Sequence, residues 1–353
     1  MSPARGRVLV LGPHGVAGRA IADRIGCSAD WDLITASRRP GPSQHPAHGH
    51  TSVDLLDAAA TRTAFADLGP VTHLVYAAYL EHPTMAETTG PNVAMLANAL
   101  DALRDANVAL RRVVLIGGGK SYGEHLGPYK TPAKESDERF LGPIFYNDQE
   151  DLLAVRARAG EFTWTVLRPD AMIGYSTGSP MNLLTSIAVF AALSKDAGVP
   201  LRFPGSPQAW TALHQFTDAH LLASATQWAL TAETASNQVF NVVNGDLFRW
   251  QHLWSDIAHL FDMKVAAPQP MSLVDQMADK EPAWDRLVRR HQLQPTPFAQ
   301  IASWGFADGI WNSDFDMVQS TIKIRQAGFH DCIDSHDCLT RHLAWLRNHR
   351  HVP

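Results

Sequence analysis

The sequence predicts an α/β protein in which a doubly wound parallel sheet is combined with a smaller, mostly helical C-terminal lobe. Between residues 7 and 174, short runs of β-branched and apolar residues alternate with stretches of helical length. Unbroken apolar runs are typical of strands covered on both faces, and their alternation with helices predicts parallel pairing. Residues 250–353 carry six of the ten tryptophans, interleaved with Met and Pro, and these residues are expected to form the helical lobe.

Individual elements follow from these patterns. The expected strands are 8–11, 32–35, 73–76, 113–116, 163–167 and 238–243, and the clearest expected helices are 87–107 and 148–160. We expect the sheet domain to comprise residues 1–178 and 212–247, and the lobe to comprise residues 179–211 and 248–353. Ordinary packing explains each tryptophan of the lobe at least as well as a role in a pocket does.

Composition restricts the class of protein. Of the 353 residues, 45% are hydrophobic, which is ample for a core, and the formal net charge of -5 disfavours nucleic acid and membrane surfaces as partners. Three cysteines cannot all pair within the chain, so no disulfide framework is expected. The apolar stretches are too short for a signal peptide or a membrane span. We therefore expect a cytoplasmic protein that acts on a small molecule, with a homodimer as the candidate assembly.

A glycine-rich turn follows the first expected strand and opens a helical stretch. Gly12, Gly15 and Gly18 would allow a tight turn, close approach of the backbone to a pyrophosphate, and close packing of helix on strand. A purely structural turn is the alternative, because a glycine triplet alone is a weak signal. Its position between a strand and a helix favours a Rossmann-type dinucleotide site, with His14 and Val16 beside the cofactor.

The end of the second expected strand indicates which cofactor is bound. A site for NAD places an acidic residue there, whereas this chain has Ser37, Arg38 and Arg39, which suit a 2′-phosphate. A solvated basic turn is the alternative interpretation. NADPH is therefore the expected cofactor. Further contacts are expected on the adenine side and at the end of strand 73–76, from Asp54, Leu55, Ala77 and Ala78.

Tyr146 and Lys120 are the expected catalytic pair. Short-chain dehydrogenases keep a lysine four residues after the tyrosine, on the same helical face. Here that position is Glu150, whose carboxylate would oppose a phenolate, so the cation must come from elsewhere. Lys120, at the end of strand 113–116, is the candidate. Each residue alone is better explained as a buried aromatic or a surface lysine, but both together behind a dinucleotide turn favour catalysis.

With these motifs, the chain resembles the progesterone 5β-reductase/iridoid synthase-like group of atypical short-chain dehydrogenases. The resemblance extends over nearly the whole chain, and its most specific parts are Lys120 with Tyr146 and the Asn-Gly-Asp segment at 244–246. It implies NADPH-dependent reduction of the carbon–carbon double bond of an enone or enal. The cofactor contacts that it implies around the nicotinamide are Gly118, Lys120, Tyr146, Pro169, Ile173 and Ser176.

The substrate pocket is expected at the carboxyl ends of the strands, where the lobe closes over the nicotinamide. Tyr79, Met181, Asn182, Trp210 and Trp304 are the residues expected to form it. Ordinary short-chain dehydrogenases hold the substrate carbonyl with Ser or Thr, but this chain has Gly117 or Gly118 at that position, so one hydroxyl donor is missing.

Hydride addition to the β-carbon of an enone leaves an enolate. Tyr146 can donate a hydrogen bond to its oxygen, because a phenol with a pKa of about 10 stays protonated at pH 7. Lys120 is expected to lower that pKa, and the α-carbon proton is expected to come from solvent. The alternatives are direct carbonyl reduction or sugar-nucleotide epimerisation on the same fold, and a non-catalytic NADP-binding regulator. No metal site is expected, since the His-Asp-Cys repeats at 330–332 and 336–338 lack zinc-ligand spacing.

Overall fold

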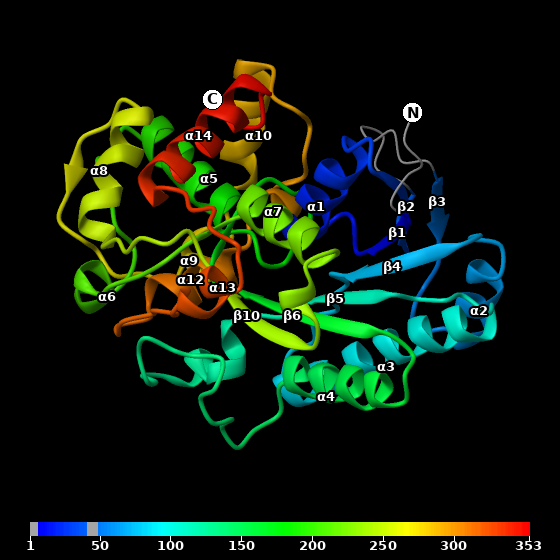
Figure 1. The fold of residues 1–353 in the computed structure, drawn as a ribbon. Helices are drawn as coiled ribbons and strands as arrows, with labels where there is room; N and C mark the ends of the chain where they lie inside the picture. The colour runs from blue at the N-terminus through cyan, green and yellow to red at the C-terminus, as the bar shows by residue number, and fades with distance from the viewer. Residues whose placement is uncertain (1–5, 41–48) are drawn as a thin grey trace.

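The computed structural model describes residues 6–40 and 49–353, and the centre of this described part is a seven-stranded sheet (Figure 1). Neighbouring strands pair in parallel, in the order β3-β2-β1-β4-β5-β6-β10. The predicted doubly wound parallel sheet is therefore confirmed. Its strands are β1 (Gly6–Leu11), β2 (Trp31–Ser37), β3 (Gly49–Ser52), β4 (Val71–Tyr76), β5 (Arg112–Ile116), β6 (Thr163–Pro169) and β10 (Gln238–Val242).

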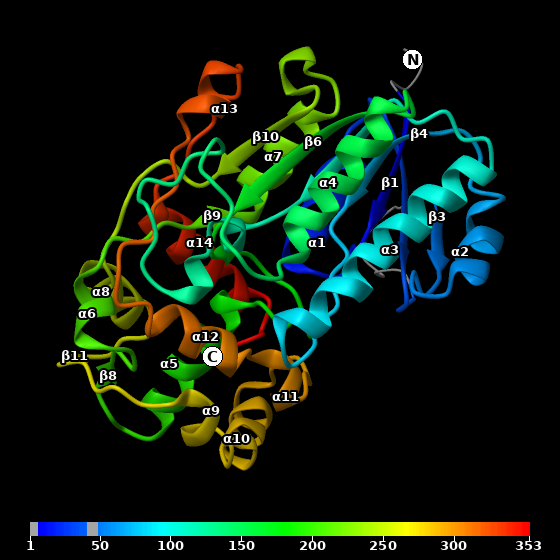
Figure 2. The ribbon, with the colours of Figure 1, turned by 90° about the horizontal axis from the view of Figure 1, so that it is seen from below.

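Helices cover both faces of the sheet, which explains why its inner strands are apolar without alternation. In β1, Val8 enters a hydrophobic cluster with α1 and α7, whereas Leu9 enters a second cluster on the opposite face. Figure 2 shows α3 and α4 lying across that opposite face. The helices of the two faces are α1 (Val16–Gly26) and α7 (Ala219–Ala229) on one side, and α2 (Ala58–Phe65), α3 (Met85–Asp105) and α4 (Phe145–Arg158) on the other.

The second part of the molecule, the helical lobe, packs around an aromatic core. The rings of Trp254 and Trp311 are fully buried with centroids 5.5 Å apart, and Phe203 lies 5.2 Å from Trp254. Trp250 and Trp284 are fully buried as well, so packing accounts for these four tryptophans. The lobe consists of α5 (Leu183–Asp196), α6 (Pro207–Thr211), α8 (Trp250–Leu260), α9 (Leu273–Gln276), α10 (Glu281–His291), α11 (Phe298–Ile301), α12 (Trp304–Trp311) and α14 (Ser335–Asn348).

The chain between α12 and α14 returns to the sheet domain. Ile324 of α13 (Ile322–Gln326) and the nearby Phe329 belong to the hydrophobic cluster that covers β10. The residue limits expected for the two parts stay predictions. Two further short parallel pairs form outside the main sheet: β7 (Met172–Ile173) with β9 (Thr217–Asp218), and β8 (Leu201–Arg202) with β11 (Val265–Ala266).

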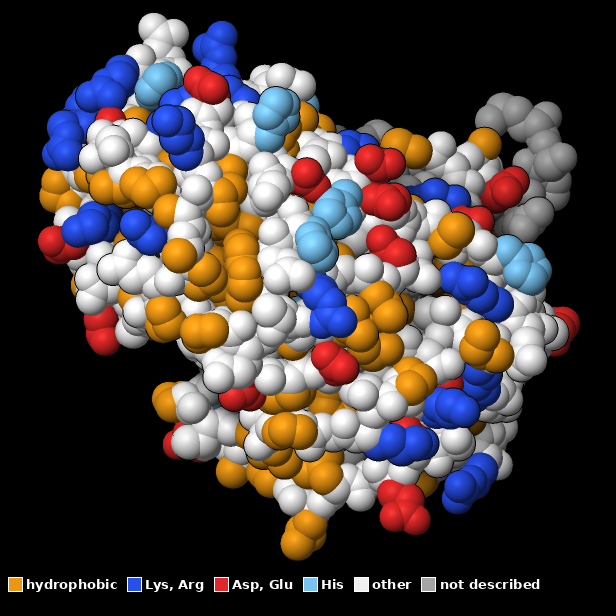
Figure 3. Space-filling model, turned by 90° about the vertical axis from the view of Figure 1, so that its left-hand side faces the viewer, with side chains coloured by type: hydrophobic (Ala, Val, Ile, Leu, Met, Phe, Trp, Pro, Cys, Tyr) orange, Lys and Arg blue, Asp and Glu red, His pale blue; other side chains and the backbone are white. Residues whose placement is uncertain are grey.

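Two observations concern the outer surface, and the expectation of no nucleic-acid or membrane partner stays a prediction. Among the described residues, no helix is both long enough and apolar enough to cross a membrane. Acidic, basic and hydrophobic side chains are all present on the face of the lobe drawn in Figure 3. That face is therefore not the continuous basic surface that a nucleic-acid-binding protein presents.

A buried ion pair joins α4 to β6. Arg168 Nη2 lies 2.7 Å from Glu150 Oε1 and 2.8 Å from Oε2, and the two side chains are only 6% and 5% exposed. Glu150 therefore pairs with Arg168, and its carboxylate is neutralised there rather than directed against the Tyr146 phenol. The Arg168 guanidinium also lies over the Tyr122 ring, 4.9 Å from its centroid, and Tyr122 donates a hydrogen bond to Asn241 in β10.

Removing Arg168 should destabilise the fold strongly. Arg168→Met keeps much of the side-chain volume but leaves Glu150 buried with only the 44%-exposed Arg139 nearby. Breaking a buried ion pair in this way typically costs about 3–5 kcal/mol of unfolding free energy, which urea denaturation would measure. Arg139→Met is the matched control, because exposed pairs contribute about 1 kcal/mol or less. Equally small losses of unfolding free energy in Arg168→Met and Arg139→Met would show that the Glu150–Arg168 ion pair does not hold α4 against β6.

Candidate active site

Three glycines shape the turn between β1 and α1, and each has a different reason to be glycine. Gly12 has a φ of +82°, and a Cβ there would lie 2.5 Å from the Ala77 carbonyl oxygen. At Gly18, a Cβ would lie 2.1 Å from the Gly12 oxygen. At Gly15, the nearest described atom would be the same oxygen at 3.8 Å, an ordinary contact. Packing therefore requires glycine at positions 12 and 18, whereas glycine at position 15 leaves the N-terminus of α1 open to a ligand.

This turn has two neighbours in space: the end of β2, and residues 176–177, which follow β7. Ser176 donates a hydrogen bond from its hydroxyl to the His14 carbonyl oxygen at 2.5 Å, and Arg39 donates to the Thr177 carbonyl oxygen at 3.3 Å. Ser37 donates to the Arg39 carbonyl oxygen at 2.9 Å. Burial and the neighbouring Arg39 charge lower the pKa of His14, so this imidazole is neutral at pH 7. The structure thus brings His14, Ser37, Arg39 and Ser176 together.

The expected adenine-side residues follow β3. The Asp54 carboxylate accepts a hydrogen bond from the Leu56 backbone N–H at 3.0 Å, which fixes the turn, and Leu55 is buried under it. Ala77 continues from β4 and donates its backbone N–H to Leu11 in β1 at 3.0 Å. The small residues Ala77 and Ala78 therefore lie directly beside the glycine turn, where the sequence placed them.

A cavity of about 920 Å³ lies where the sheet domain meets the lobe. Tyr146 and Lys120 both line it, with Gly118 and Pro169. Tyr146 occupies the first turn of α4, which begins three residues earlier than predicted, and its phenol lies against Gly118. A Cβ at Gly118 would be 3.1 Å from the Tyr146 hydroxyl, so a Ser or Thr side chain would displace the phenol.

Burial has the largest effect on the pKa of the Tyr146 phenol, and the expectation that Lys120 lowers this pKa stays a prediction. Burial raises the pKa of Tyr146 above its usual value, and neighbouring Tyr79 and Glu124 raise it further. The phenol is therefore protonated at neutral pH and available as a hydrogen-bond donor. Lys120 can still add positive potential to the cavity, because its side chain lines the same space.

Of the five residues expected in the substrate pocket, Met181 lines the cavity and the other four are not among its lining residues. Tyr79 stacks on Phe145 with ring centroids 5.5 Å apart, and Asn182 caps α5 by accepting a hydrogen bond from the Thr185 N–H. Trp210 and Trp304 are half-buried against the core of the lobe, Trp210 5.1 Å from Phe203 and Trp304 6.0 Å from Phe298, and their place in the substrate pocket stays a prediction.

Sequence reasoning missed several residues that do line the cavity. Apolar side chains come from α12 and the loop after it, among them Phe306, Ile310, Phe315 and Met317. Acidic side chains also line it, notably Glu124 and Asp170. A signal for the acids was present, since Glu124 follows Lys120 by four residues and Asp170 directly follows Pro169.

Comparison with known proteins places this arrangement in a family. A model of the PRISE-like Rossmann-fold domain matches residues 48–332. The chain belongs to that family. It is 33% identical to an (S)-8-oxocitronellyl enol synthase from Camptotheca acuminata, over 98% of this chain and 93% of that protein. It is 31% identical to the 3-oxo-Delta(4,5)-steroid 5-beta-reductase of Arabidopsis thaliana, over 97% of this chain and 91% of the relative.

These relatives confirm the resemblance and the prediction that the PRISE-like chain is an enzyme. Among solved structures, UDP-glucose 4-epimerase of Thermus thermophilus in complex with NAD is 18% identical, with a TM-score of 0.67 over 97% of this chain and 99% of the epimerase. RMD from Pseudomonas aeruginosa complexed with NADPH is 15% identical, with a TM-score of 0.67 over 96% of each chain. At this identity the likeness extends to the fold alone.

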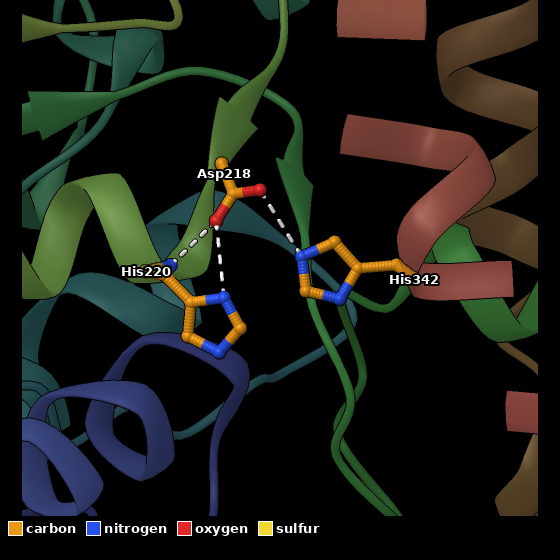
Figure 4. A group of neighbouring side chains, drawn as sticks. All are labelled: Asp218, His220 and His342. Carbon is orange, nitrogen blue, oxygen red and sulfur yellow. Dashed lines mark hydrogen bonds and ion pairs between the residues drawn. The ribbon is translucent and has the colours of Figure 1, made fainter. Parts of the chain in front are cut away.

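A second polar cluster of the PRISE-like chain joins the sheet domain to the lobe (Figure 4). Asp218, which caps α7, lies 3.5 Å from the His220 ring and 3.2 Å from the His342 ring of α14. Ligand atoms of these three residues lie within 4.8 Å of one another, as a metal site requires. Arg341 also pairs with Asp218, so a cation there would meet a positive charge. The absence of a metal site stays a prediction.

The role assigned to Gly15 can be tested without disturbing the fold. Gly15→Ala should unfold at nearly the wild-type temperature, because the added Cβ meets ordinary contacts among the described residues. Gly15→Ala should weaken NADPH binding roughly tenfold or more, because the added Cβ would keep the pyrophosphate away from the backbone N–H groups. Losing one charge-assisted hydrogen bond to phosphate costs about 1.5–3 kcal/mol. Fluorescence titration would measure the affinity. If a stably folded Gly15→Ala protein bound NADPH with unchanged affinity, the pyrophosphate would not bind at the start of α1.

Proposed function

We propose that this PRISE-like protein is an NADPH-dependent reductase that adds hydride to the β-carbon of an enone or enal. The observation that carries the proposal is the protonated Tyr146 phenol, which lines the cavity beside Gly118 and close to Lys120. The names of the relatives support it, since one is a reductase of a 3-oxo-Delta(4,5)-steroid, which is an enone. Cytoplasmic location and a homodimer stay predictions.

The residues present fit the proposed cofactor. Gly15 leaves open space at the N-terminus of α1, where backbone N–H groups and the helix dipole favour a pyrophosphate. Arg38 and Arg39 are exposed at the end of β2, where the 2′-phosphate of NADPH would lie. When bound, NADPH supplies the hydride. Pro169 ends β6 at the carboxyl edge of the sheet and Ile173 follows shortly after in β7, which suits contact with the nicotinamide.

The chain's own residues stabilise the charge that develops on the substrate. As hydride reaches the β-carbon, negative charge moves to the carbonyl oxygen, and Tyr146 donates a hydrogen bond to that oxygen. The phenol need not transfer its proton, because the product carbonyl re-forms when the α-carbon is protonated. Lys120 adds positive potential near the oxygen. The apolar side chains of α12 hold the rest of the substrate, and they exclude water from the part of the cavity that they line.

Cofactor preference gives one test. Arg38→Ala or Arg39→Ala should weaken NADPH roughly ten- to a hundredfold and hardly affect NADH, because each variant loses a charge-assisted contact with the 2′-phosphate. Both dissociation constants can be measured by fluorescence titration. Arg62→Ala, an exposed arginine paired with Asp105, is the control and should leave both values unchanged. Equal affinity of the unmodified protein for NADPH and NADH would overturn the assignment.

The position of the transferred hydride tests the reaction itself. With deuterium at the transferable C4 position of NADPH, the label should appear at the β-carbon of the saturated product, detected by NMR. Tyr146→Phe should slow this transfer about 10²- to 10³-fold, the usual effect of removing one oxyanion donor. Lys120→Met should slow it by a similar or smaller factor while NADPH still binds. Deuterium on the carbinol carbon of an allylic alcohol would instead establish direct carbonyl reduction.

A further inference from the structure

Besides the exposed Glu81, two carboxyl groups line the cavity with the catalytic pair. Glu124 begins the short 3-10 helix Glu124–Leu126, and Asp170 directly follows β6. Asp170 is 8% exposed, and its Oδ1 accepts a hydrogen bond from the Ala171 N–H at 2.7 Å. The other oxygen, Asp170 Oδ2, and Glu124 Oε2 are both buried without a hydrogen-bond partner among the described residues. Buried polar atoms of this kind indicate that something else, a proton or a ligand, completes the site.

The carboxyl of Glu124 lines the same cavity as the Tyr146 phenol. A Cβ on Gly119 would lie 2.1 Å from Glu124 Oε2, just as a Cβ on Gly118 would lie 3.1 Å from the Tyr146 hydroxyl. The two groups therefore cover consecutive residues of one cavity wall. Their electrostatic coupling agrees with this placement, because Glu124 raises the pKa of Tyr146. An enolate oxygen held by Tyr146 has its α-carbon two bonds away, inside the cavity that Glu124 also lines.

Electrostatics keep a proton on the carboxyl pair. Burial, and then the charge of Asp170, raise the pKa of Glu124 well above its ordinary value, while Lys120 opposes the shift. Burial also raises the pKa of Asp170 to about 7. Two like charges in one buried site cannot both ionise cheaply, so the pair titrates as a unit and retains one proton near neutral pH.

The groups that face the carboxyl pair come from four segments. Lys120 and Tyr146 lie on the catalytic wall, and His125 follows Glu124 with its pKa lowered by burial and by Lys120. Tyr129, whose hydroxyl is buried and unpartnered among the residues described, faces both carboxyls. The side-chain amide of Gln319 approaches from the loop before α13, with its Nε2 2.7 Å from the Cβ position of Gly119. A further carboxyl of the cavity, that of Glu81, lies on the segment after β4; burial raises its pKa and Lys120 opposes that rise.

We propose that Glu124 is the acid that protonates the α-carbon of the enolate, and that Asp170 keeps the proton on the carboxyl pair until it is used. This inference rests on the proposed function. In the step, the enolate electron pair forms a new C–H bond at the α-carbon with the Glu124 proton, and the carbonyl double bond re-forms. Glu124 is left as a carboxylate and regains one proton from water for each turnover. This replaces the expectation that the proton comes from solvent directly.

The protonated pair can be observed in the free protein. Infrared spectroscopy at pH 7 should show the C=O stretch of a neutral carboxylic acid, which Glu124→Gln and Asp170→Asn should each remove or shift. Glu138→Gln, an exposed glutamate in the same loop region, is the control and should leave the band unchanged. Thermal unfolding confirms that each variant is folded. A spectrum without a protonated carboxyl at pH 7, or one that neither variant alters, overturns the proposal.

The second experiment uses the product of turnover in D₂O, with hydride of ordinary hydrogen. The unmodified protein and Glu138→Gln should place deuterium on one face of the α-carbon. Glu124→Gln should react about 10²- to 10⁴-fold more slowly, the usual contribution of a general acid, and should place α-deuterium on both faces. Turnover of the unmodified protein should fall as pH rises through the pKa of the pair, because the acid form is required. Asp170→Asn should move this fall to lower pH, since it removes the like charge that raises the Glu124 pKa.

The outcomes separate the two proposals. If the cofactor label is absent from the β-carbon, the proposed function fails whatever Glu124 does. If the β-label is present but Glu124→Gln keeps wild-type turnover and one-face α-deuteration, the reductase stands and Glu124 is not its acid. Loss of facial selectivity in Glu124→Gln, with NADPH affinity unchanged, supports the assignment.

Discussion

The buried pair of Glu150 and Arg168 is the interaction on which the active site depends. It ties the first turns of α4, which carry Tyr146, to the end of β6, from which Pro169 and Asp170 continue into the cavity. A lysine four residues after the tyrosine, the common arrangement, would face Arg168 across a buried space and raise the cost of burying both charges. Glutamate at 150 and the cation at Lys120 therefore belong together. Moving the cation off α4 makes room for an acid that locks the helix to the sheet.

Much of the fold could be predicted because its signals are local. Strands buried on both faces are continuous apolar runs, and the predicted runs match β1, β2, β4, β5, β6 and β10 closely. The sequence signal is weakest at β3, a polar edge strand of Gly-His-Thr-Ser whose side chains are not in the core. The start of α4 was placed three residues late, because Ile144 precedes it without a capping side chain. Local chemistry gave no sign of that boundary.

The features of the site also fall into two groups, those that local motifs predict and those that depend on tertiary contacts. Lys120, Tyr146, Gly118 and Pro169 could be placed from motifs, and they do line one cavity. What the tryptophans contact could not be predicted, because an apolar ring suits a pocket and a core equally, and Trp210 and Trp304 pack against the core of the lobe. The proximity of Glu124 to Asp170 is a tertiary fact between distant segments. The effect of burial on the Tyr146 phenol likewise depends on neighbours that no spacing rule supplies.

The tie between Asp218 and α14 has a consequence for how the chain is made. Asp218 is completely buried at the start of α7, and two of its described partners, Arg341 and His342, lie close to the end of the chain. A ribosome releases the sheet strands long before it releases these residues. Until then the Asp218 carboxylate has His220 as a partner but lacks Arg341 and His342, so burying its charge costs more free energy. Burial of Asp218 in the sheet domain is therefore complete only once α14, which begins more than 100 residues after Asp218, is also in place.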